Sequence, residues 1–512
     1  MIEENKSSMK NSVRRLVIAG IGVLIQIIWV VVLVMRLNQY SQIITLLTVA
    51  IELVLVLAVY SMDTNAAFKL PWIILITVAP IVGICVFFLF GRSGATKKVR
   101  TRYRKIDQQL FAYLNQDEQI IEELSKKDER LANDFKYLWK CASSPVYKNT
   151  DVKYYGDTCD AMAAQLEDMM KAKQFIFLEY HAIEMAESFQ ALRKVLMAKA
   201  REGVEIRILY DDAGCIGFLN PRFIKYMESM GIQCRVFNPI MPVLNIFMNN
   251  RDHRKITVID GKVAYTGGYN LADEYFNITH PYGQWKDSGI RFEGDAVQTA
   301  TILFLEMWNA LKEQDVDIEK YLPVYPYKAK EQGFFALYGD SPLDKEPAGE
   351  NVYMNLLRHA KKYIYFTTPY LILSDEMTRE LTGAAKRGVD VRIITPGIPD
   401  KKTIFQVTKS YYPQLLKHGV KIYEYTPGFM HEKQCICDGE IVVVGTINLD
   451  FRSLYLHFEN AALFCGYEAV SHVKEDFDAL FPICKDMSKE PSERTRRLRL
   501  SQLILRLFSP LM

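Results

Sequence analysis

The feature that most constrains the fold is an internal duplication that begins near residue 150. Residues 172–177 (AKQFIF) are matched by residues 360–365 (AKKYIY), and residues 200–208 (AREGVEIRI) are matched by residues 385–393 (AKRGVDVRI). Each copy reads as a strand, a helix, a glycine turn and a second strand, which is typical of an α/β fold with helices packed on a sheet. The duplication therefore predicts two pseudo-symmetric α-β-α sandwich domains with a site where they meet.

A short motif recurs in both copies with identical spacing. Its pattern is H-x-K-x4-D, followed by a glycine seven residues and an asparagine ten residues after the aspartate. Its polar members are His253, Lys255, Asp260 and Asn270 in the first copy, and His431, Lys433, Asp438 and Asn448 in the second. A single histidine near a surface lysine would mean little, but two copies with the same downstream spacing indicate a functional role.

The residues around each motif predict a strand, a tight turn and a second strand. The segment after each lysine is mostly apolar and rich in β-forming residues, and the Asp-Gly pair that follows is a hairpin signal. Side chains two residues apart on a strand share a face, so the histidine and the lysine point the same way. This pair suits a phosphate ester, because imidazole is a nucleophile or acid/base and ammonium binds phosphate oxygens. Asp260 and Asp438 fall at the turns, so we interpret them as structural first and catalytic second.

Three apolar runs open the chain, at residues 16–35, 43–60 and 70–90. A helix of about 20 apolar residues spans a bilayer, and the first and third runs have that length. The second run is marginal because it contains Glu52, and a carboxylate inside a bilayer is costly. No small-residue cleavage site follows the first run. We therefore expect residues 1–95 to form an uncleaved anchor of two to three transmembrane helices.

Basic residues beside these runs predict the topology. Seven lysines and arginines lie between residues 92 and 105, which places the large domain in the cytoplasm by the positive-inside rule. Four basic residues between residues 6 and 15 argue the same for the N-terminus. Two spans satisfy both clusters and three do not, so the number of spans stays open. The predicted location is the cell membrane, as a multi-pass protein.

The remaining chain divides into four predicted parts. Residues 96–149 form a basic linker and helical connector, residues 150–335 and 336–490 form the two domains, and residues 491–512 form a basic amphipathic tail. Arginine alternates with leucine and isoleucine in the tail, which is typical of a helix on an anionic membrane surface. Packing against the domain is the alternative, and the arginine content favours the membrane.

Bulk composition excludes some partners. The formal net charge is only +3 over 512 residues, so there is no basic signature of a nucleic-acid-binding protein. The nine cysteines are scattered and match neither a disulfide framework nor a zinc-binding spacing. We therefore expect no nucleic acid and no metal.

With their glycine and asparagine extensions, the two motifs resemble the HKD motifs of the phospholipase D superfamily, over about residues 150–485. Residues 80–92 (PIVGICVFFLFGR) and 444–453 (VGTINLDFRS) are also similar to bacterial cardiolipin synthases, although a third apolar run departs from their two-span form. The resemblance implies transfer of a phosphatidyl group from one phosphatidylglycerol to another, giving cardiolipin and glycerol, with no cofactor. A hydrolytic phospholipase D, a nuclease of the same superfamily and an inactive scaffold are the alternatives. Homo-oligomerisation is left open.

The resemblance also implies roles for individual residues. It implies a phosphohistidine, with His253 as nucleophile and His431 as acid/base, although the pseudo-symmetric sequence alone does not distinguish the two. It further implies an orienting acid downstream of each motif. The candidates are Asp287, 34 residues after His253, and Glu459, 28 residues after His431.

The other polar residues carry weaker expectations. Asn270 and Asn448 are expected to bind the phosphate or to support the turn after each motif. The remaining histidines, His181 and His457 among them, have no counterpart at matching spacing in the other copy. We therefore expect them to be ordinary core or surface residues.

Overall fold

The structure is a computed structural model of the 512-residue chain. It describes residues 21, 24–25, 28–29, 31–33, 35–36, 42–88, 97–219, 222–240, 249–312, 315, 317–490 and 498–511. The first apolar run, residues 16–35, lies largely outside the described residues, so its predicted span stays a prediction. The domain division predicted from the sequence also stays a prediction, and the elements below are given as they are observed.

The first half builds a seven-stranded mixed sheet in the order β1-β9-β7-β6-β2-β3-β4. Strands β2, β3 and β4 are parallel, whereas β6, β7, β9 and β1 pair antiparallel. The strands are β1 (Thr150–Tyr155), β2 (Phe175–Tyr180), β3 (Glu205–Asp211), β4 (Gln233–Phe237), β6 (Lys255–Ile259), β7 (Val263–Gly267) and β9 (Gly289–Gly294). The β6–β7 hairpin turns at Asp260-Gly261, as the sequence predicts.

The second half repeats this order, with one strand added at the end. Its path is β10-β17-β16-β15-β11-β12-β13-β18, so each strand from β10 to β13 occupies the place of one strand in the first sheet. The strands are β10 (Phe334–Asp340), β11 (Tyr363–Thr367), β12 (Asp390–Pro396), β13 (Lys421–Tyr425), β15 (Gln434–Cys437), β16 (Ile441–Gly445), β17 (His457–Cys465) and β18 (Cys484–Asp486). The duplication in the sequence is thus a duplication of topology.

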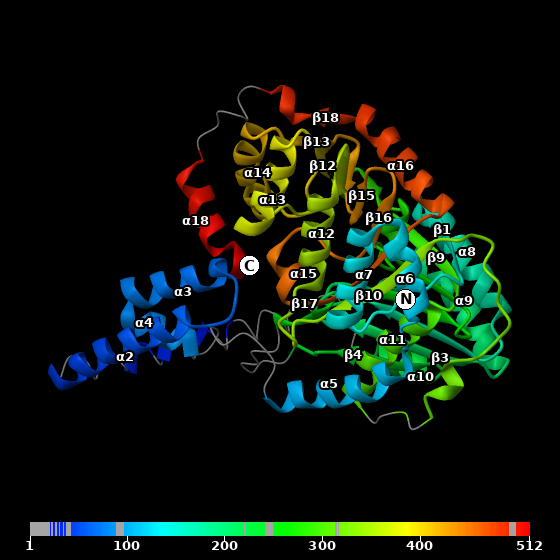
Figure 1. The fold of residues 1–512 in the computed structure, drawn as a ribbon. Helices are drawn as coiled ribbons and strands as arrows, with labels where there is room; N and C mark the ends of the chain where they lie inside the picture. Colours follow the sequence, from blue (N-terminus) through cyan, green and yellow to red (C-terminus); the bar gives the residue numbers. More distant parts are fainter. Residues whose placement is uncertain are drawn as a thin grey trace.

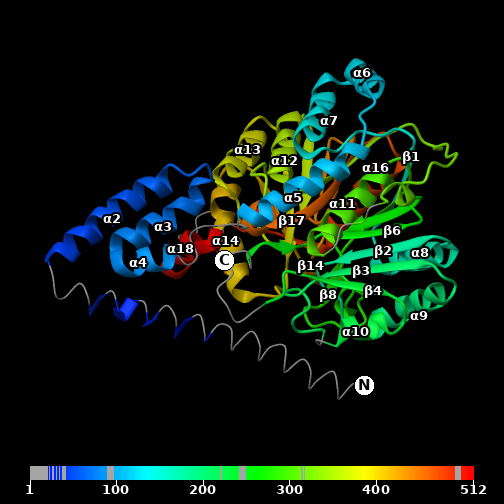
Figure 2. The same cartoon turned by 90° about the horizontal axis from the view of Figure 1, so that it is seen from below.

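The two sheets enclose a central helical layer. Helix α11 (Val297–Leu311) is buried over most of its length, and its apolar side chains belong to the same core as residues from both sheets and from α16 (Glu468–Leu480). A helix that is apolar on all sides is stable only when it is surrounded, which this position provides. Figure 2 shows α11 and α16 between the two halves.

Further helices cover the outer faces. On the first sheet these are α8 (Thr158–Lys171), α9 (Glu187–Arg201) and α10 (Phe223–Glu228); on the second they are α12 (Ala348–His359), α13 (Asp375–Lys386) and α14 (Lys402–Lys417). The connector helices precede them: α5 (Lys97–Leu110) packs on α11, and α6 (Glu118–Lys127) and α7 (Glu129–Ala142) pack beside α12 and β10. The α/β sandwich architecture predicted from the sequence is present.

The N-terminal helices project from one side of this body (Figure 1). They are α2 (Gln42–Tyr60), α3 (Ala66–Val78) and α4 (Pro80–Val86). The third apolar run was expected to form one span, but it divides between α3 and α4 at Ala79, because the residue before a proline disfavours helical geometry. A Cβ on Gly83 would lie 2.5 Å from the Ile76 backbone, so glycine allows α4 to fold back on α3. Within the part of the chain that the structure describes, no helix combines the length and apolarity needed to cross a bilayer.

The C-terminal tail forms α18 (Leu500–Phe508) and η8 (Ser509–Leu511). Gln502 is 1% exposed and donates to the Gln406 carbonyl of α14, and the Arg506 guanidinium lies 4.0 Å from the centre of the Tyr411 ring. One side of α18 therefore packs on the domain, and the expectation that the tail lies on a membrane surface stays a prediction for its other side.

Candidate active site

Each motif histidine is placed by a strand pair that crosses between the halves. Strand β5 (Arg251–Asp252) of the first half pairs with β17 of the second, and the backbone N–H of His253 donates to Phe458 at 2.9 Å. Strand β14 (Gly428–Met430) of the second half pairs with β8 (Gln284–Lys286) of the first, and the backbone N–H of His431 donates to Lys286 at 2.8 Å. Each motif therefore begins against a strand of the other half.

This crossing decides which carboxylate meets which imidazole. Nδ1 of His253 lies 2.8 Å from Oε2 of Glu459, and Nδ1 of His431 lies 2.5 Å from Oδ2 of Asp287. Sequence spacing counted each acid from the histidine of its own copy, and the structure corrects this pairing. The reason is that β5 and β14 carry each histidine across the interface. Since a carboxylate only accepts hydrogen bonds, both imidazoles hold their proton on Nδ1 and leave Nε2 free for chemistry.

Both imidazoles line one pocket of about 560 Å³ that draws its lining from both halves. Asn270 and Asn448 line it as well. Oδ1 of Asn270 accepts from the backbone N–H of Ala182, and its Nδ2 donates to the Tyr275 hydroxyl, whereas Oδ1 of Asn448 has no hydrogen-bond partner among the described residues. A buried amide oxygen without a partner is costly, so Asn448 is available to a ligand in this pocket.

The motif lysines lie beside their histidines, as the strand periodicity predicts. Nζ of Lys255 donates to the carbonyl of His253 at 2.7 Å, and Nζ of Lys433 lies 2.8 Å from Nδ1 of His431. Burial lowers the pKa of Lys255 to about 8 and that of Lys433 to about 7. A buried ammonium group beside each imidazole suits a phosphate, whose negative charge would offset the desolvation of the lysines.

The imidazoles are held neutral. Burial, followed by the charge of Lys255, holds the pKa of His253 well below its usual value. Burial, followed by the charge of Lys433, lowers the pKa of His431 to about 3. The pKa of Asp287 is lowered: burial alone would raise it, but its interaction with His431 and the charge of Lys433 outweigh that effect. A neutral imidazole with a free Nε2 is the form that can attack phosphorus or take a proton.

The surroundings of the two histidines differ. Aromatic rings surround His431: the ring centres of Trp285, Tyr275 and Phe429 lie 5.1, 5.2 and 5.8 Å from its own. Beside His253 lie two further imidazoles, His181 at 5.0 Å and His457 at 5.7 Å.

Sequence reasoning treated His181 and His457 as ordinary and did not find the aromatic residues. A usable signal existed, because His457 and Trp285 each precede an orienting acid by two residues. Two residues apart on a strand means the same face, so both positions could have been assigned to the pocket.

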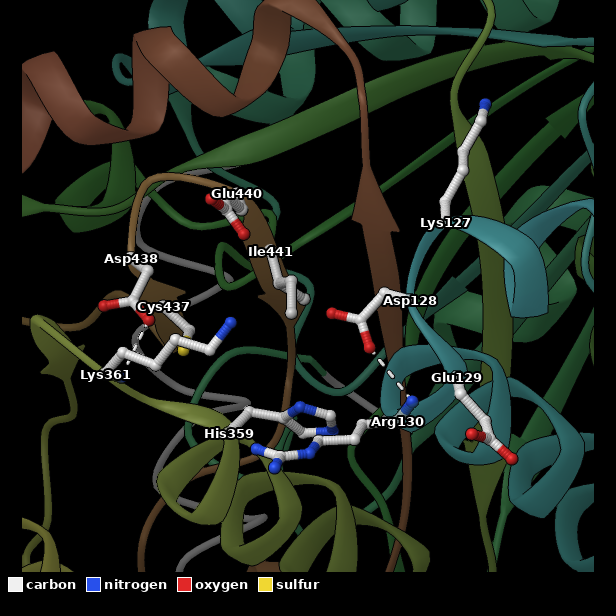
Figure 3. A pocket seen from close by; sticks show the side chains of 10 residues that line it. All are labelled: Lys127, Asp128, Glu129, Arg130, His359, Lys361, Cys437, Asp438, Glu440 and Ile441. Atoms are coloured by element: carbon white, nitrogen blue, oxygen red, sulfur yellow. Dashed lines mark hydrogen bonds between the residues drawn. The ribbon is translucent and has the colours of Figure 1, made fainter.

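The motif aspartates lie elsewhere. The Asp260 carboxylate accepts the backbone N–H groups of residues 173–175, and the Asp438 carboxylate accepts those of residues 361–363. Both aspartates have φ of 53° and close their hairpins. Figure 3 shows Asp438 at a separate cavity of about 330 Å³, with its carboxylate turned toward Lys361. These contacts tie each motif hairpin to the start of the neighbouring strand, which fits the structural role that the sequence puts first for both aspartates.

Known proteins match this chain over most of its length. A family model described as "Cardiolipin synthase, PLD-like domain" matches residues 166–308 and 353–481. An uncharacterized protein of Streptococcus mutans is 39% identical over 460 residues, which cover 90% of this chain and 99% of that protein. A cardiolipin synthase of Halalkalibacterium halodurans is 32% identical over 442 residues, covering 86% and 87%.

A solved structure has the same fold. The crystal structure of a phosphatidylserine synthase from Haemophilus influenzae Rd KW20 matches with a TM-score of 0.53. The match covers 70% of this chain and 93% of that one at 14% identity. At that identity the likeness concerns the α/β fold alone.

Proposed function

Because the chain belongs to the phospholipase D-like cardiolipin synthase family and is a phosphatidyltransferase, we propose that it converts two phosphatidylglycerol molecules into cardiolipin and glycerol through a phosphohistidine. The observation that carries this proposal is the pair of buried imidazoles in one pocket, each bonded to a carboxylate of the other half. Such a pair can divide nucleophile and acid/base duties across a single phosphorus atom.

In the first step, the Nε2 lone pair of His253 attacks the phosphorus of one phosphatidylglycerol. The bond from phosphorus to the head-group oxygen breaks, and the imidazolium of His431 gives that oxygen its Nε2 proton, so glycerol leaves. Lys255 and Lys433 hold the non-bridging phosphate oxygens throughout. The products of this step are glycerol and a phosphatidyl group bound to His253.

In the second step, neutral His431 takes the proton from a hydroxyl of a second phosphatidylglycerol. The hydroxyl oxygen attacks phosphorus, the bond from phosphorus to His253 breaks, and its electron pair returns to Nε2. Cardiolipin is released and His431 is again an imidazolium, so protons and bonds balance over the cycle. Glu459 and Asp287 keep both rings in the required tautomer.

The assignment of roles is supported by the surroundings of each ring. An acid/base imidazole carries a positive charge in part of the cycle, and aromatic faces within about 6 Å stabilise a cation. His431 has three such rings and Asp287. Beside His253 lie instead the imidazoles of His181 and His457. A bound phosphate adds negative charge beside His431 and favours its protonation there.

The membrane part of the proposal rests on the N-terminal helices. Nine large hydrophobic side chains of α2 are 46–72% exposed: Ile43, Leu46, Leu47, Val49, Ile51, Leu53, Val54, Leu57 and Tyr60. Contiguous apolar exposure of this extent is typical of a surface covered by lipid or protein. We propose that residues 1–95 anchor the chain in the cell membrane as a multi-pass segment, with the large domain in the cytoplasm. No nucleic acid is part of this function.

We also propose the division of the chain that the sequence predicts. The anchor is followed by the connector, residues 96–149, two domains at residues 150–335 and 336–490, and the tail at residues 491–512. The start of β1 at Thr150 and the placement of β10 at Phe334 support the domain boundaries to within two residues.

The direct test is the product formed by the purified full chain in detergent with phosphatidylglycerol alone and a chelator present. The proposal predicts cardiolipin and free glycerol in equal amounts, both lost in His253→Ala and His431→Ala. Phosphatidic acid in place of cardiolipin would assign a hydrolase. No lipid product from folded protein would contradict a lipid substrate.

A further inference from the structure

The C-terminal segment contributes to the lining of the catalytic pocket. Ser509, which begins η8, lines the pocket together with Phe451 of α15 (Phe451–Tyr455) and Ile404 of α14. Phe68 of α3 packs edge-on against Phe451 at 5.5 Å. Helices α18 and α3 therefore both lie against residues that line the pocket.

Helix α18 is fixed in this place by polar contacts along one side. Gln502 meets Gln406, and Arg506 donates to the Ser410 carbonyl at 3.4 Å. These contacts run in the same order along both helices, so α18 lies parallel to α14. Helix α18 also contacts α3, and Figure 1 shows it between α14 and α3.

The opposite side of α18 is apolar and uncovered. Leu500, Leu503 and Ile504 are 74, 49 and 50% exposed. Their spacing of three and four residues puts them on one stripe of the helix. On the neighbouring α3, Leu70 and Val78 are 51 and 78% exposed.

Exposed cations accompany this apolar stripe. Arg499 lies directly before Leu500, and Lys401 and Lys402 stand at the start of α14, where α18 also begins. An apolar stripe flanked by basic residues is complementary to a bilayer that contains anionic lipid.

We propose that the exposed face of α18, defined by Leu500, Leu503 and Ile504, docks on an anionic bilayer and opens the catalytic pocket to lipid head groups within it. A pocket of about 560 Å³ has the size of a site for one small ligand, so it holds head groups and leaves the acyl chains outside. Drawing acyl chains into water costs about 0.8 kcal/mol per CH₂, so the pocket mouth has to adjoin the membrane. This inference rests on the proposed function, because it supplies the route by which that substrate arrives.

The test compares long-chain with short-chain phosphatidylglycerol in the full chain carrying Leu503→Glu and Ile504→Glu together. Long-chain substrate is presented in proteoliposomes at varied mole fraction, and dihexanoyl phosphatidylglycerol is presented as dissolved monomer. We expect the specificity constant for long-chain substrate to fall roughly 10- to 30-fold, because two exposed apolar side chains no longer enter the bilayer. Turnover of the monomeric substrate is expected to stay within about twofold, because neither residue lines the pocket.

The matched control is Ile483→Glu, which removes an apolar side chain of similar exposure, 47%, next to β18. It is expected to change neither assay. Equal losses on both substrates in the α18 double variant would overturn the proposal, as would no loss in proteoliposomes. A change in oligomeric state with unchanged long-chain turnover would instead assign this face to contacts between copies. Failure of the unsubstituted chain to turn over monomeric substrate would count against the proposed function and not against the docking face.

Discussion

The two halves of the chain arose from one duplicated segment, and each contributes one side of the catalytic pocket. The residues that surround His253 nevertheless differ from those that surround His431. Two residues before the motif histidine stands Arg251 in the first half and Phe429 in the second. Two residues before the orienting acid stand Trp285 and His457, and four residues after the motif asparagine stand Glu274 and Arg452. All six residues line the pocket.

The comparison separates the elements that position the two histidines from the lining residues that set their electrostatic surroundings. The strand pairs β5–β17 and β14–β8 and the crossed carboxylates are the same in both halves. The lining is aromatic around His431 and polar around His253. Duplication thus kept the frame that places two imidazoles in one pocket, and divergence of the lining surrounded His431 with aromatic rings.

The largest expected effect comes from removing either imidazole. His253→Ala should lower kcat on the order of 10⁶-fold, as expected for loss of a nucleophile. His431→Ala should lower it by about 10²–10⁴-fold, as expected for loss of an acid/base group. Steady-state cardiolipin synthesis measures both. Equal losses of kcat in the two variants would contradict the different roles proposed for His253 and His431.

The next largest effect is expected at Glu459 and Asp287. Each of these carboxylates bonds the motif histidine of the other half, which makes a specific prediction. Glu459→Gln and Asp287→Asn should each lower kcat by about 10²–10⁴-fold, because the tautomer of the bonded imidazole is no longer fixed. A phosphatidyl ester of p-nitrophenol needs no protonation of its leaving group. Release of p-nitrophenol should therefore recover in Asp287→Asn and stay slow in Glu459→Gln. The reverse pattern would assign each acid to the histidine of its own half.

The pKa values of the two motif lysines predict that kcat/KM falls at alkaline pH, which gives the pH profile a descending limb. Lys433 and Lys255, with pKa values of about 7 and 8, are charged below those values and lose their charge as the pH rises through them. Phosphate binding should therefore weaken between about pH 7 and 8, up to tenfold per pH unit. Lys433→Arg keeps its charge and should move the limb upward. A limb at the same pH in Lys433→Arg and Lys255→Arg would contradict this explanation.

Removing an aromatic ring from the His431 wall should have a smaller effect. Tyr275→Leu should lower kcat by about 2- to 30-fold, because a cation–π contact contributes about 0.5–2 kcal/mol. Tyr275→Phe is the matched control, since it keeps the ring and loses only the hydrogen bond from Asn270. If both variants lose the same activity, the hydrogen bond and not the ring accounts for the role of Tyr275.

The smallest effect on turnover is expected at the motif aspartates. Asp438→Asn should lower the free energy of unfolding by about 1.5–3 kcal/mol, because a charged acceptor of three backbone N–H groups is lost. The kcat of the folded fraction should stay within about twofold, because Asp438 does not line the pocket. Thermal unfolding and turnover of the same sample measure the two quantities, and a large fall in kcat without loss of stability would place Asp438 in the reaction.

The sequence predicted the elements whose signals are local. Strand periodicity and the Asp-Gly turns gave the β6–β7 and β15–β16 hairpins, and the duplicated spacing gave His253, His431 and their lysines. The pairing of Glu459 with His253 could not be read in this way, because it depends on β5 crossing to β17, 206 residues away along the chain. Phe429 was missed for the same reason, since its contact with Trp285 joins the two halves, whereas Trp285 itself had a local signal two residues before Asp287.

The N-terminal segment shows where a compositional signal is too coarse. Residues 70–90 have the apolar content of one span, but Pro80 and Gly83 turn the segment back on itself. Length and hydropathy do not reveal a break of this kind, whereas the steric restriction on the residue before a proline predicts it.

The most direct test of the central claim is to trap and map the covalent intermediate. The full chain would be mixed with phosphatidylglycerol labelled in its phosphate, quenched in alkali, where phosphohistidine is stable, and digested for peptide mapping. The proposed roles predict label on the peptide that carries His253, increased in His431→Ala when a p-nitrophenyl ester is the donor. Label on the peptide that carries His431, or no histidine-bound label while cardiolipin is being formed, would contradict the role of His253 as nucleophile.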